Sequence, residues 1–266
     1  MQPLRYLVLP LLSLLFLTAC SEIDEDERLI YVKPTPVGRN VLIEDFTGQR
    51  CVNCPTATSE IEKLQEYYGE DHVIAVGIHS GPFAKSVRGV PYPLYTEIGD
   101  EYYNYWKVES QPMGVINRTG TCDYLSWGAK VRDDLSKNAQ VSLEASCDYD
   151  KASRNATITV KGNGVEGSVS GSLQVWLTED NITDFQLMPD GSRNDAYVHN
   201  HVLRCAVNGT WGVSFHVGEA EQFIYDFTQI LDDGWVPENM HVVAFVYDDT
   251  GVYQVTTCPV VPRLEW

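Results

Sequence analysis

Two cysteines with two residues between them, Cys51 and Cys54, are the side chains of this 266-residue chain best placed for chemistry. Thiols at this spacing close a disulfide, and the thiolate form attacks other disulfides. A helix that begins at the second cysteine stabilises negative charge through its unpaired N–H groups. We therefore expect Cys51, lying nearer to solvent, to attack a substrate disulfide, and Cys54 to break the mixed disulfide that results.

The elements that would position this motif follow from hydrophobic patterning. Residues 41–46 form a short apolar run, as in a buried strand of a mostly parallel sheet. Residues 73–78 form a second run, and the residues between the two runs have helical periodicity. Four apolar residues fall on one face of that helix: Ala57, Ile61, Leu64 and Tyr68. A C-x-x-C motif between a strand and a helix is the redox signature of the thioredoxin-like fold, which this order predicts.

Gln111 and Pro112 precede a further apolar strand over residues 113–117. In thioredoxin-like proteins, which this part of the chain resembles, a cis-proline directly before the third core strand lies against the C-x-x-C motif. Bonds to proline are the ones that adopt the cis form. The resemblance therefore implies a substrate groove shaped by Arg50, Gln111 and Pro112.

The predicted thioredoxin-like domain spans residues 40–138. A return strand over residues 122–125 and a helix over residues 126–137, with Ser126 as its candidate N-cap, complete it. An insert at residues 80–110 includes a predicted helix over residues 94–107. The insert is rich in aromatic residues: Tyr95, Tyr102, Tyr103, Tyr105 and Trp106. Either these rings cover a face of the sheet, or they line a groove beside the C-x-x-C motif, since aromatics dominate recognition surfaces.

Departures from a typical redox thioredoxin leave the chemistry of the motif open. Arg50 stands where a tryptophan usually precedes the motif, and Val52-Asn53 replaces the usual Gly-Pro. Arg50 also adds positive charge beside Cys51, which favours its thiolate. The alternative is a static disulfide that staples the start of the helix. A zinc site formed by the two cysteines, with His79 approaching from the next strand, is a further possibility. The sequence has no second pair of ligands at zinc-finger spacing, so no metal or other cofactor is predicted.

From residue 139 the pattern changes to short strands of period two, separated by Gly, Asn and Asp turns. The candidate strands span residues 140–147, 155–161, 172–178, 196–206, 222–229, 241–247 and 252–257. Seven short strands without an intervening helix predict an antiparallel, immunoglobulin-like β-sandwich over residues 139–266. The predicted fold class is therefore α+β with two domains, a thioredoxin-like α/β domain followed by an all-β sandwich.

Two histidines and two cysteines of the second predicted domain have suggestive spacing. His199 and His201 are two residues apart, so a strand would place both imidazoles on one face. That geometry permits a metal pair, but no third ligand is identifiable, and hydrogen-bonded structural histidines are the preferred interpretation. Cys205 and Cys258 would close a disulfide if their Cα atoms lay within about 7 Å. Spacing does not decide how the four remaining cysteines pair: Cys122, Cys147, Cys205 and Cys258.

The first 19 residues have the features of a signal peptide. A positive charge at Arg5 precedes an apolar stretch over residues 6–17, too short to span a bilayer. The run Leu-Thr-Ala-Cys that ends at Cys20 resembles a bacterial lipobox, which implies lipid on Cys20 as the membrane anchor. The alternative is an ordinary secretory signal. Residues 20–39 form an acidic tether, similar to tracts that route lipoproteins to the outer face of the outer membrane.

Composition limits the partners of this chain. It has 37 acidic and 19 basic residues, a formal net charge of −18. Because phosphate binding needs a basic surface, nucleic acid is excluded as a partner. We expect an outer membrane lipoprotein exposed at the cell surface, with the periplasmic face as the alternative. Its expected partners are the membrane, through lipid on Cys20, and an exported protein or peptide; the oligomeric state is not predicted.

Three motifs together resemble the outer-membrane-protein-28-related lipoprotein family: FTGQRCVNCP at residues 46–55, VHNHVLR at residues 198–204 and NGTWG at residues 208–212. The resemblance runs from residue 41 to the end of the chain. It implies a thioredoxin-like domain followed by a β-sandwich on an outer membrane lipoprotein, and it implies no firm activity. Two hypotheses follow. The protein is a thiol–disulfide oxidoreductase acting through Cys51 and Cys54, or it is a non-catalytic surface lipoprotein that binds a ligand or partner.

Overall fold

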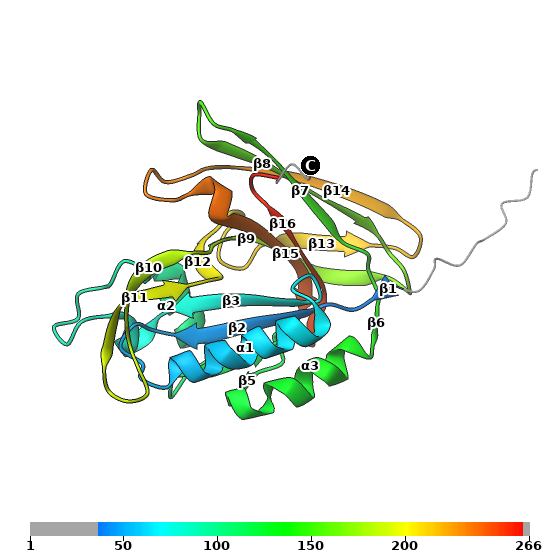
Figure 1. Ribbon diagram of the computed structural model, residues 1–266. Helices are drawn as coiled ribbons and strands as arrows, with labels where there is room; N and C mark the ends of the chain where they lie inside the picture. The colour runs from blue at the N-terminus through cyan, green and yellow to red at the C-terminus, as the bar shows by residue number, and fades with distance from the viewer. Residues whose placement is uncertain (1–36, 263–266) are drawn as a thin grey trace, which may run out of the picture. The chain divides into compact units, whose positions relative to one another are not determined.

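The computed structural model describes residues 37–262, which belong to one compact unit (Figure 1). The predicted signal peptide, Cys20 and residues 20–36 of the predicted tether lie outside the described residues. The α-helices are α1 (Cys54–Tyr68), α2 (Glu97–Tyr105) and α3 (Trp127–Leu135). The strands are β1 (Val37–Gly38), β2 (Val41–Thr47), β3 (Val73–His79), β4 (Met113–Ile116), β5 (Thr121–Cys122), β6 (Asn138–Ala139), β7 (Glu144–Asp150), β8 (Asn155–Asn163), β9 (Val169–Glu179), β10 (Ile182–Leu187), β11 (Arg193–His199), β12 (Val202–Ala206), β13 (Val213–Val217), β14 (Gln222–Ile230), β15 (Met240–Asp248) and β16 (Gly251–Pro259). The described chain is thus mostly β, with several sheets.

One nine-stranded sheet runs through most of the described chain. Its order is β16-β15-β9-β12-β3-β2-β4-β5, and β13 also pairs with β9. β2 and β3 are parallel, whereas β4 is antiparallel to β2. All seven residues of β2 are buried, in keeping with its apolar run. β12 joins β3 through the pair Val202 and Gly77 and lies antiparallel to β9, so residues far apart in sequence share this sheet.

Helices α1 and α3 pack on one face of β2, β3 and β4 (Figure 1). The order β2–α1–β3 is the one that the sequence predicts. α1 tolerates Pro55 in its first turn, where a backbone N–H would have no intrahelical partner. It ends before Gly69, whose φ of +97° stops the helix. The predicted apolar stripe of α1 contributes to this core: Ala57, Ile61, Leu64 and Tyr68.

The opposite face of the sheet carries an aromatic core. Tyr102 of α2 is fully buried and packs against Trp176 of β9, with ring centroids 5.3 Å apart. The part of the insert that holds Tyr102 therefore covers a sheet face. α2 is shorter than the helix predicted over residues 94–107. Thr96 starts it by accepting from the Gly99 N–H, and Lys107, with φ of +50°, cannot continue it.

β14, β8 and β7 form a separate three-stranded sheet that packs against β9 and β15 across a shared apolar core. This all-β component, two sheets face to face, is the part of the predicted fold class that the structure supports. The strand predicted over residues 196–206 is wrong as one element. It is two strands, β11 and β12, because His201 adopts φ of +58° between them and donates its N–H to Asp180.

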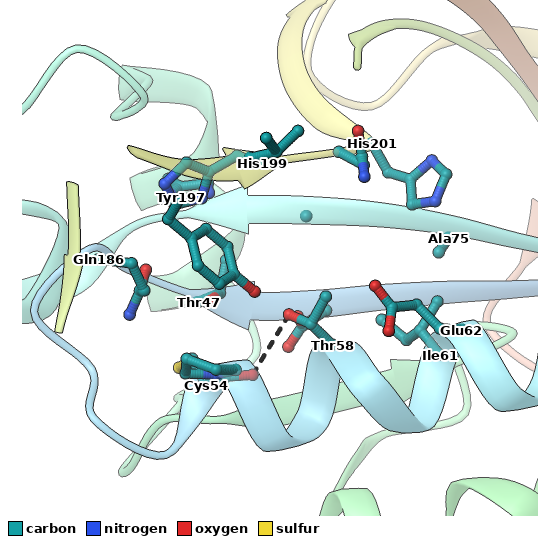
Figure 2. A pocket seen from close by; sticks show the side chains of 16 residues that line it. Thr47, Cys54, Thr58, Ile61, Glu62, Ala75, Gln186, Tyr197, His199 and His201 are labelled. Carbon is teal, nitrogen blue, oxygen red and sulfur yellow. Dashed lines mark hydrogen bonds between the residues drawn. The ribbon is translucent and has the colours of Figure 1, made fainter. Parts of the chain in front are cut away.

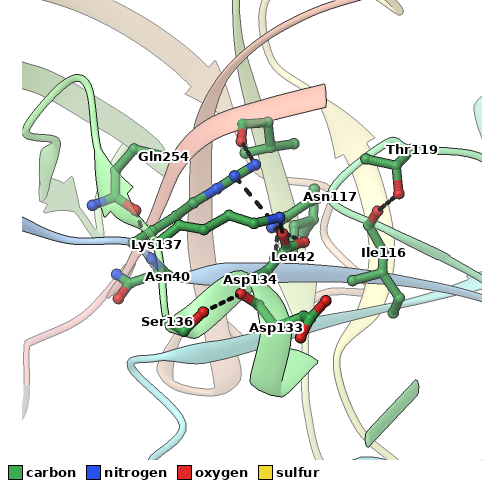
Figure 3. Close-up of polar contacts among 12 residues, drawn as sticks. Asn40, Leu42, Ile116, Asn117, Thr119, Asp133, Asp134, Ser136, Lys137 and Gln254 are labelled. Atoms are coloured by element: carbon green, nitrogen blue, oxygen red, sulfur yellow. Dashed lines mark hydrogen bonds and ion pairs between the residues drawn. The ribbon is translucent and has the colours of Figure 1, made fainter. Parts of the chain in front are cut away.

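Polar contacts join the segment before β2 to the last strand (Figure 3). The Asn40 N–H donates to Gln254 Oε1 at 2.8 Å. The Leu42 N–H donates to Asn117 Oδ1 at 2.8 Å, and Asn117 Nδ2 donates to Asp134 at the end of α3. The domain boundary after residue 138 stays a prediction; the described residues on its two sides share one sheet and these contacts.

Close packing between β4 and α3 leads to a first testable prediction. A Cβ at Gly114 would lie 2.4 Å from the indole of Trp127, which is fully buried. We expect Gly114→Ala to lower the free energy of unfolding by about 1–3 kcal/mol, the usual cost of overpacking. Gly38→Ala is the matched control, because nothing lies within 4 Å of the added Cβ. Urea denaturation measures both, and equal losses would contradict the packing described.

Candidate functional site

Cys51 and Cys54 form a disulfide at the N-terminal end of α1, with their Cα atoms 5.4 Å apart. The Cys51 N–H donates to the Gly48 carbonyl at 2.9 Å, and the Cys54 N–H donates to the Cys51 carbonyl at 3.3 Å. The structure thus contains the predicted pair. Each cysteine is only 2% exposed, so the expectation that Cys51 lies nearer to solvent is wrong.

The motif is covered by the hairpin of β10 and β11, which pairs with no other described strand. Gln186 donates from Nε2 to the Cys51 carbonyl at 2.8 Å. The Leu187 N–H donates to the Gln49 carbonyl at 2.9 Å, and Gln49 Nε2 donates to the Phe185 carbonyl at 3.2 Å. Gln186 and Cys51 are 135 residues apart, and no spacing in the sequence indicates that they meet.

The predicted groove residues Gln111 and Pro112 lie at the start of β4 and are joined by a cis peptide bond, as expected. Gln111 is buried, and its Nε2 donates to the carbonyls of Thr47 at 2.8 Å and Ser80 at 3.1 Å. The side chain therefore ties together the ends of β2 and β3. A role for these residues in substrate binding stays a prediction.

Arg50, the third predicted groove residue, is held by the loop that follows β3. Its N–H donates to the Phe83 carbonyl at 3.0 Å, and its Nη1 donates to the Lys85 carbonyl at 3.2 Å. The two segments approach closely because Gly48 lies between them. A Cβ at Gly48 would lie 2.5 Å from the Phe83 carbonyl carbon. This loop and the hairpin together enclose the turn that carries Cys51.

A small, partly open cavity of about 50 Å³ lies between the start of α1, the ends of β2 and β3, and β11 (Figure 2). Asp45, Cys54, His79, Tyr197 and His199 are among its lining residues. Three buried atoms at this cavity have no hydrogen-bond partner among the described residues: Asp45 Oδ1, His79 Nδ1 and His199 Nε2. The rings of His79 and His199 meet edge to face, with centroids 5.2 Å apart.

Burial shifts the titration of all three groups toward their neutral forms. It raises the pKa of Asp45 to about 7. It lowers the pKa of His199 to about 4. The pKa of His79 is lowered well below its ordinary value, first by burial and then by the nearby His199 and Arg204. At neutral pH the cavity therefore holds two neutral imidazoles and a carboxyl group that can gain or lose a proton, beside Cys54.

The family profile described as Outer membrane protein Omp28 matches residues 99–262 of this chain. The chain belongs to the Omp28 outer membrane protein family. This confirms the resemblance inferred from the three sequence motifs. The matched residues include the covering hairpin and the cavity residue His199, but they begin after Cys54. Family membership therefore supports an outer membrane location. It is not evidence for redox chemistry at Cys51 and Cys54, which lie outside the matched residues.

Two solved structures are similar to parts of this chain. HBP35 of Porphyromonas gingivalis is similar over 84% of this chain and 76% of that chain, with a TM-score of 0.65 and 15% sequence identity, which shows a shared fold. A domain of the outer membrane lipoprotein Omp28 from Porphyromonas gingivalis is 32% identical over 47% of this chain and 91% of that domain, with a TM-score of 0.35. No curated protein matches the chain.

Within residues 37–262 of this Omp28-family chain, no helix is both long enough and apolar enough to cross a membrane. The same residues contain no group of three or more His, Cys, Asp or Glu side chains arranged to hold a metal ion. Attachment to the membrane through lipid on Cys20 concerns residues outside the described part of the chain.

The prediction that His199 and His201 share one strand face is wrong. His201 lies in the left-handed turn after β11 and contacts the carboxylate of Asp180. Its Nδ1 is 3.2 Å from one oxygen of Asp180, and Nδ1 of His241 is 3.3 Å from the other. His199 instead faces His79 in the cavity. Both histidines line the cavity, but the turn directs His201 toward Asp180 instead of His79.

The Cys205–Cys258 disulfide, one of the pairings left open, is not formed. Cys205 lies on β12 and Cys258 on β16, and β9 and β15 separate these strands in the sheet. Since neighbouring strands are about 4.8 Å apart, the two Cα atoms are too distant for a disulfide. Within residues 37–262, the four cysteines outside the C-x-x-C motif are free thiols: Cys122, Cys147, Cys205 and Cys258.

Proposed function

We propose that this Omp28-family protein exchanges disulfides with exported proteins or peptides through Cys51 and Cys54. The observation that carries the proposal is Asp45, a carboxyl that is 3% exposed, lacks a hydrogen-bond partner for Oδ1 and lines the same cavity as Cys54. Burying such a group costs stability. A disulfide that only staples the start of a helix has no need of it, whereas a resolving thiol does.

The arrangement supports a balanced exchange. A substrate thiolate attacks the Cys51 sulfur, the Cys51–Cys54 bond breaks, and Cys54 leaves as a thiolate that takes a proton from Asp45. A second substrate thiolate then attacks the substrate sulfur of the mixed disulfide and releases Cys51, so the substrate is oxidised and the motif reduced. In the reverse direction, Asp45 accepts the Cys54 proton as Cys54 attacks the mixed disulfide.

The fold around the motif supports the same proposal. The parallel β2–α1–β3 unit is followed by antiparallel β4 and β5 and then by α3. We propose that residues 40–138 form a thioredoxin-like domain and that Arg50, Gln111 and Pro112 shape its substrate groove. A static disulfide is the second candidate, favoured by the 2% exposure of both cysteines. In that case the protein is a non-catalytic lipoprotein that binds a ligand or partner.

An exchange assay separates the two candidates. Oxidised protein is mixed with a reduced peptide that carries two thiols, and formation of the peptide disulfide is followed by chromatography. We expect Cys51→Ser and Cys54→Ser to abolish exchange and Asp45→Asn to slow it by about 10²-fold. Cys147→Ser, outside the motif, is the control and should behave as wild type. Exchange no faster in the wild type than in Cys51→Ser would leave the static disulfide as the explanation.

The pH profile tests Asp45 separately. Re-oxidation of the reduced motif needs the ionised carboxylate as proton acceptor, so its rate should rise with pH through about 7, the pKa of Asp45. Asp45→Asn should remove that inflection and leave any that belongs to the thiols.

We further propose that lipid on Cys20 anchors the protein in the outer membrane and that the acidic tether directs it to the cell surface. Protease shaving of intact cells tests this: a surface protein is digested, whereas one on the periplasmic face is protected. Replacing the acidic residues at positions 22 and 24–27 with alanine should reduce digestion if the tether is the sorting signal. Cys20→Ser should release the protein from the membrane fraction.

A further inference from the structure

The hairpin of β10 and β11 is connected to the rest of the described chain at two points. Both connections contain a non-glycine residue in the left-handed region: Asn181 with φ of +59° and His201 with φ of +58°. Its strands pair only with each other. Hinges are typically a few residues at the ends of elements, so the hairpin can move as a unit about these two points.

Few hydrogen bonds hold the hairpin against the disulfide. A register shift between Asp184 and Gln186 interrupts the pairing of β10 with β11. Such bulges re-aim side chains, and Gln186 here donates to the Cys51 carbonyl. Gln186 Nε2 also donates to the Gly48 carbonyl at 3.4 Å, the Leu187 N–H donates to the Gln49 carbonyl, and Gln49 Nε2 donates to the Phe185 carbonyl. Breaking these bonds and lifting β10 would uncover Cys51.

The hairpin also brings a histidine against a second histidine on the body of the protein. His199 of β11 packs on His79 of β3, and one nitrogen of each ring is buried without a hydrogen-bond partner among the described residues. A proton on either of these buried nitrogens would place a charge where it has no hydrogen-bond partner, which is unfavourable. The other titratable groups that line this cavity are Asp45, Glu62, Tyr197 and His201. Asp184 and Arg204 also act on the pair.

We propose that the β10–β11 hairpin is a lid over the Cys51–Cys54 disulfide and that it opens when His79 and His199 take up protons. The biological role of the lid rests on the proposed exchange function, because controlling access to the disulfide has a consequence only if that disulfide reacts with a substrate. Gln186 and His199 are then positioning residues: they control access to the reacting sulfur atoms without touching them.

The direction of the pH dependence follows from the closed and open states. In the closed state His199 stays neutral down to pH about 4, and His79 titrates well below its ordinary range. Once exposed, imidazoles titrate near ~6.5, so opening binds up to two protons below that pH. Asp45 opposes this, because its closed-state pKa of about 7 would fall on exposure and release one proton. One net proton makes opening about tenfold more favourable for each pH unit between 6 and 5.

Access to the disulfide can be measured without catalysis. The oxidised chain is treated with a water-soluble phosphine, and its rate of reduction is divided by that of an unstructured peptide with a Cys-Val-Asn-Cys disulfide at the same pH. We expect this relative rate to rise about tenfold for each pH unit from 6 to 5. Each of His79→Gln and His199→Gln should lower the slope by about one power of ten per pH unit, since each removes one proton site.

Two further variants complete the test. Gln186→Ala should speed reduction at every pH and keep the slope, because it removes a lid contact but no titrating group. His216→Gln, an exposed histidine of β13 bonded to Ser170, is the control and should keep the wild-type slope. Near-ultraviolet circular dichroism establishes whether each variant is folded. If His79→Gln does not fold, the slope of the His199→Gln variant alone is sufficient for the test.

A relative rate that is equal at pH 7.5 and pH 5 in the wild type would overturn the proposal. So would a slope that survives in a folded His199→Gln variant. The outcome is independent of the exchange assay, because a phosphine reduces any accessible disulfide. If reduction by the phosphine accelerates at low pH but the Gln186→Ala variant shows no exchange with the dithiol peptide, the lid is supported and the proposed function is contradicted.

Discussion

Replacing Glu44 with glutamine is expected to lower the free energy of unfolding by about 3–5 kcal/mol, the range for removing one partner of a buried ion pair. Glu44 is fully buried in β2, and its Oε1 lies 3.2 Å from Nε of Arg118, which is also buried. With neutral glutamine at position 44, the Arg118 guanidinium keeps its charge without a carboxylate. The loss measures that uncompensated charge rather than the net worth of the pair.

Aromatic rings surround Arg118 and reduce its access to water. Five ring centroids lie between 4.2 and 5.7 Å from its guanidinium carbon, those of Tyr102, Trp176, Trp211, Phe245 and Tyr247. Because these rings come from both halves of the chain, Arg118 joins the turn between β4 and β5 to β9 and β15. Rings alone stabilise a cation less than a carboxylate does, so they do not replace Glu44.

Two controls make this prediction specific. Glu144→Gln removes the carboxylate of an exposed pair with Lys161 and should change the free energy of unfolding by less than about 1 kcal/mol. The double variant Glu44→Leu/Arg118→Met should regain much of the lost stability, because an apolar pair often replaces a buried ion pair at little cost. Urea denaturation measures all three. Similar losses for Glu44→Gln and Glu144→Gln would show that the burial of the pair has no energetic consequence.

Trp176→Ala is expected to cost about 3–5 kcal/mol, the usual loss for a large aromatic in a core. Trp176 is fully buried, with a relative exposure of 0%. Its ring packs 4.7 Å from Phe245, centroid to centroid, and its Nε1 donates to the Tyr102 hydroxyl at 3.0 Å. The substitution leaves a void in the core, and the Tyr102 hydroxyl loses its donor while keeping its own bond to the Thr210 carbonyl.

The manner of unfolding is as informative as its free energy. Trp176 lies on β9, but its core also contains Leu42 and Phe46 of β2. We therefore expect the variant to unfold in one transition at a lower urea concentration, with circular dichroism and fluorescence changing together. Trp211→Ala is the control, since that ring is 39% exposed and should cost less. Two separate transitions would show that residues 40–138 and 139–262 unfold independently.

Local patterns in the sequence were sufficient for the elements around the disulfide. The apolar run of β2, the stripe on α1 and the spacing of Cys51 and Cys54 each involve residues within one or two elements of each other. Periodicity and turn chemistry act over that range, so the strand–helix–strand order and the disulfide were predictable. The limits of α2 were not, because they depend on a single cap at Thr96 and on the left-handed conformation of Lys107.

The sequence by itself determined that Cys51 and Cys54 meet at the start of a helix, and only the tertiary structure decided what surrounds them. The lid contact from Gln186 spans 135 residues, and His199 reaches His79 only because the chain breaks its strand at His201. Contacts of this kind arise from packing between distant segments, which no local spacing encodes. The disulfide is a local property of this chain, whereas its burial and its neighbours are properties of the whole fold.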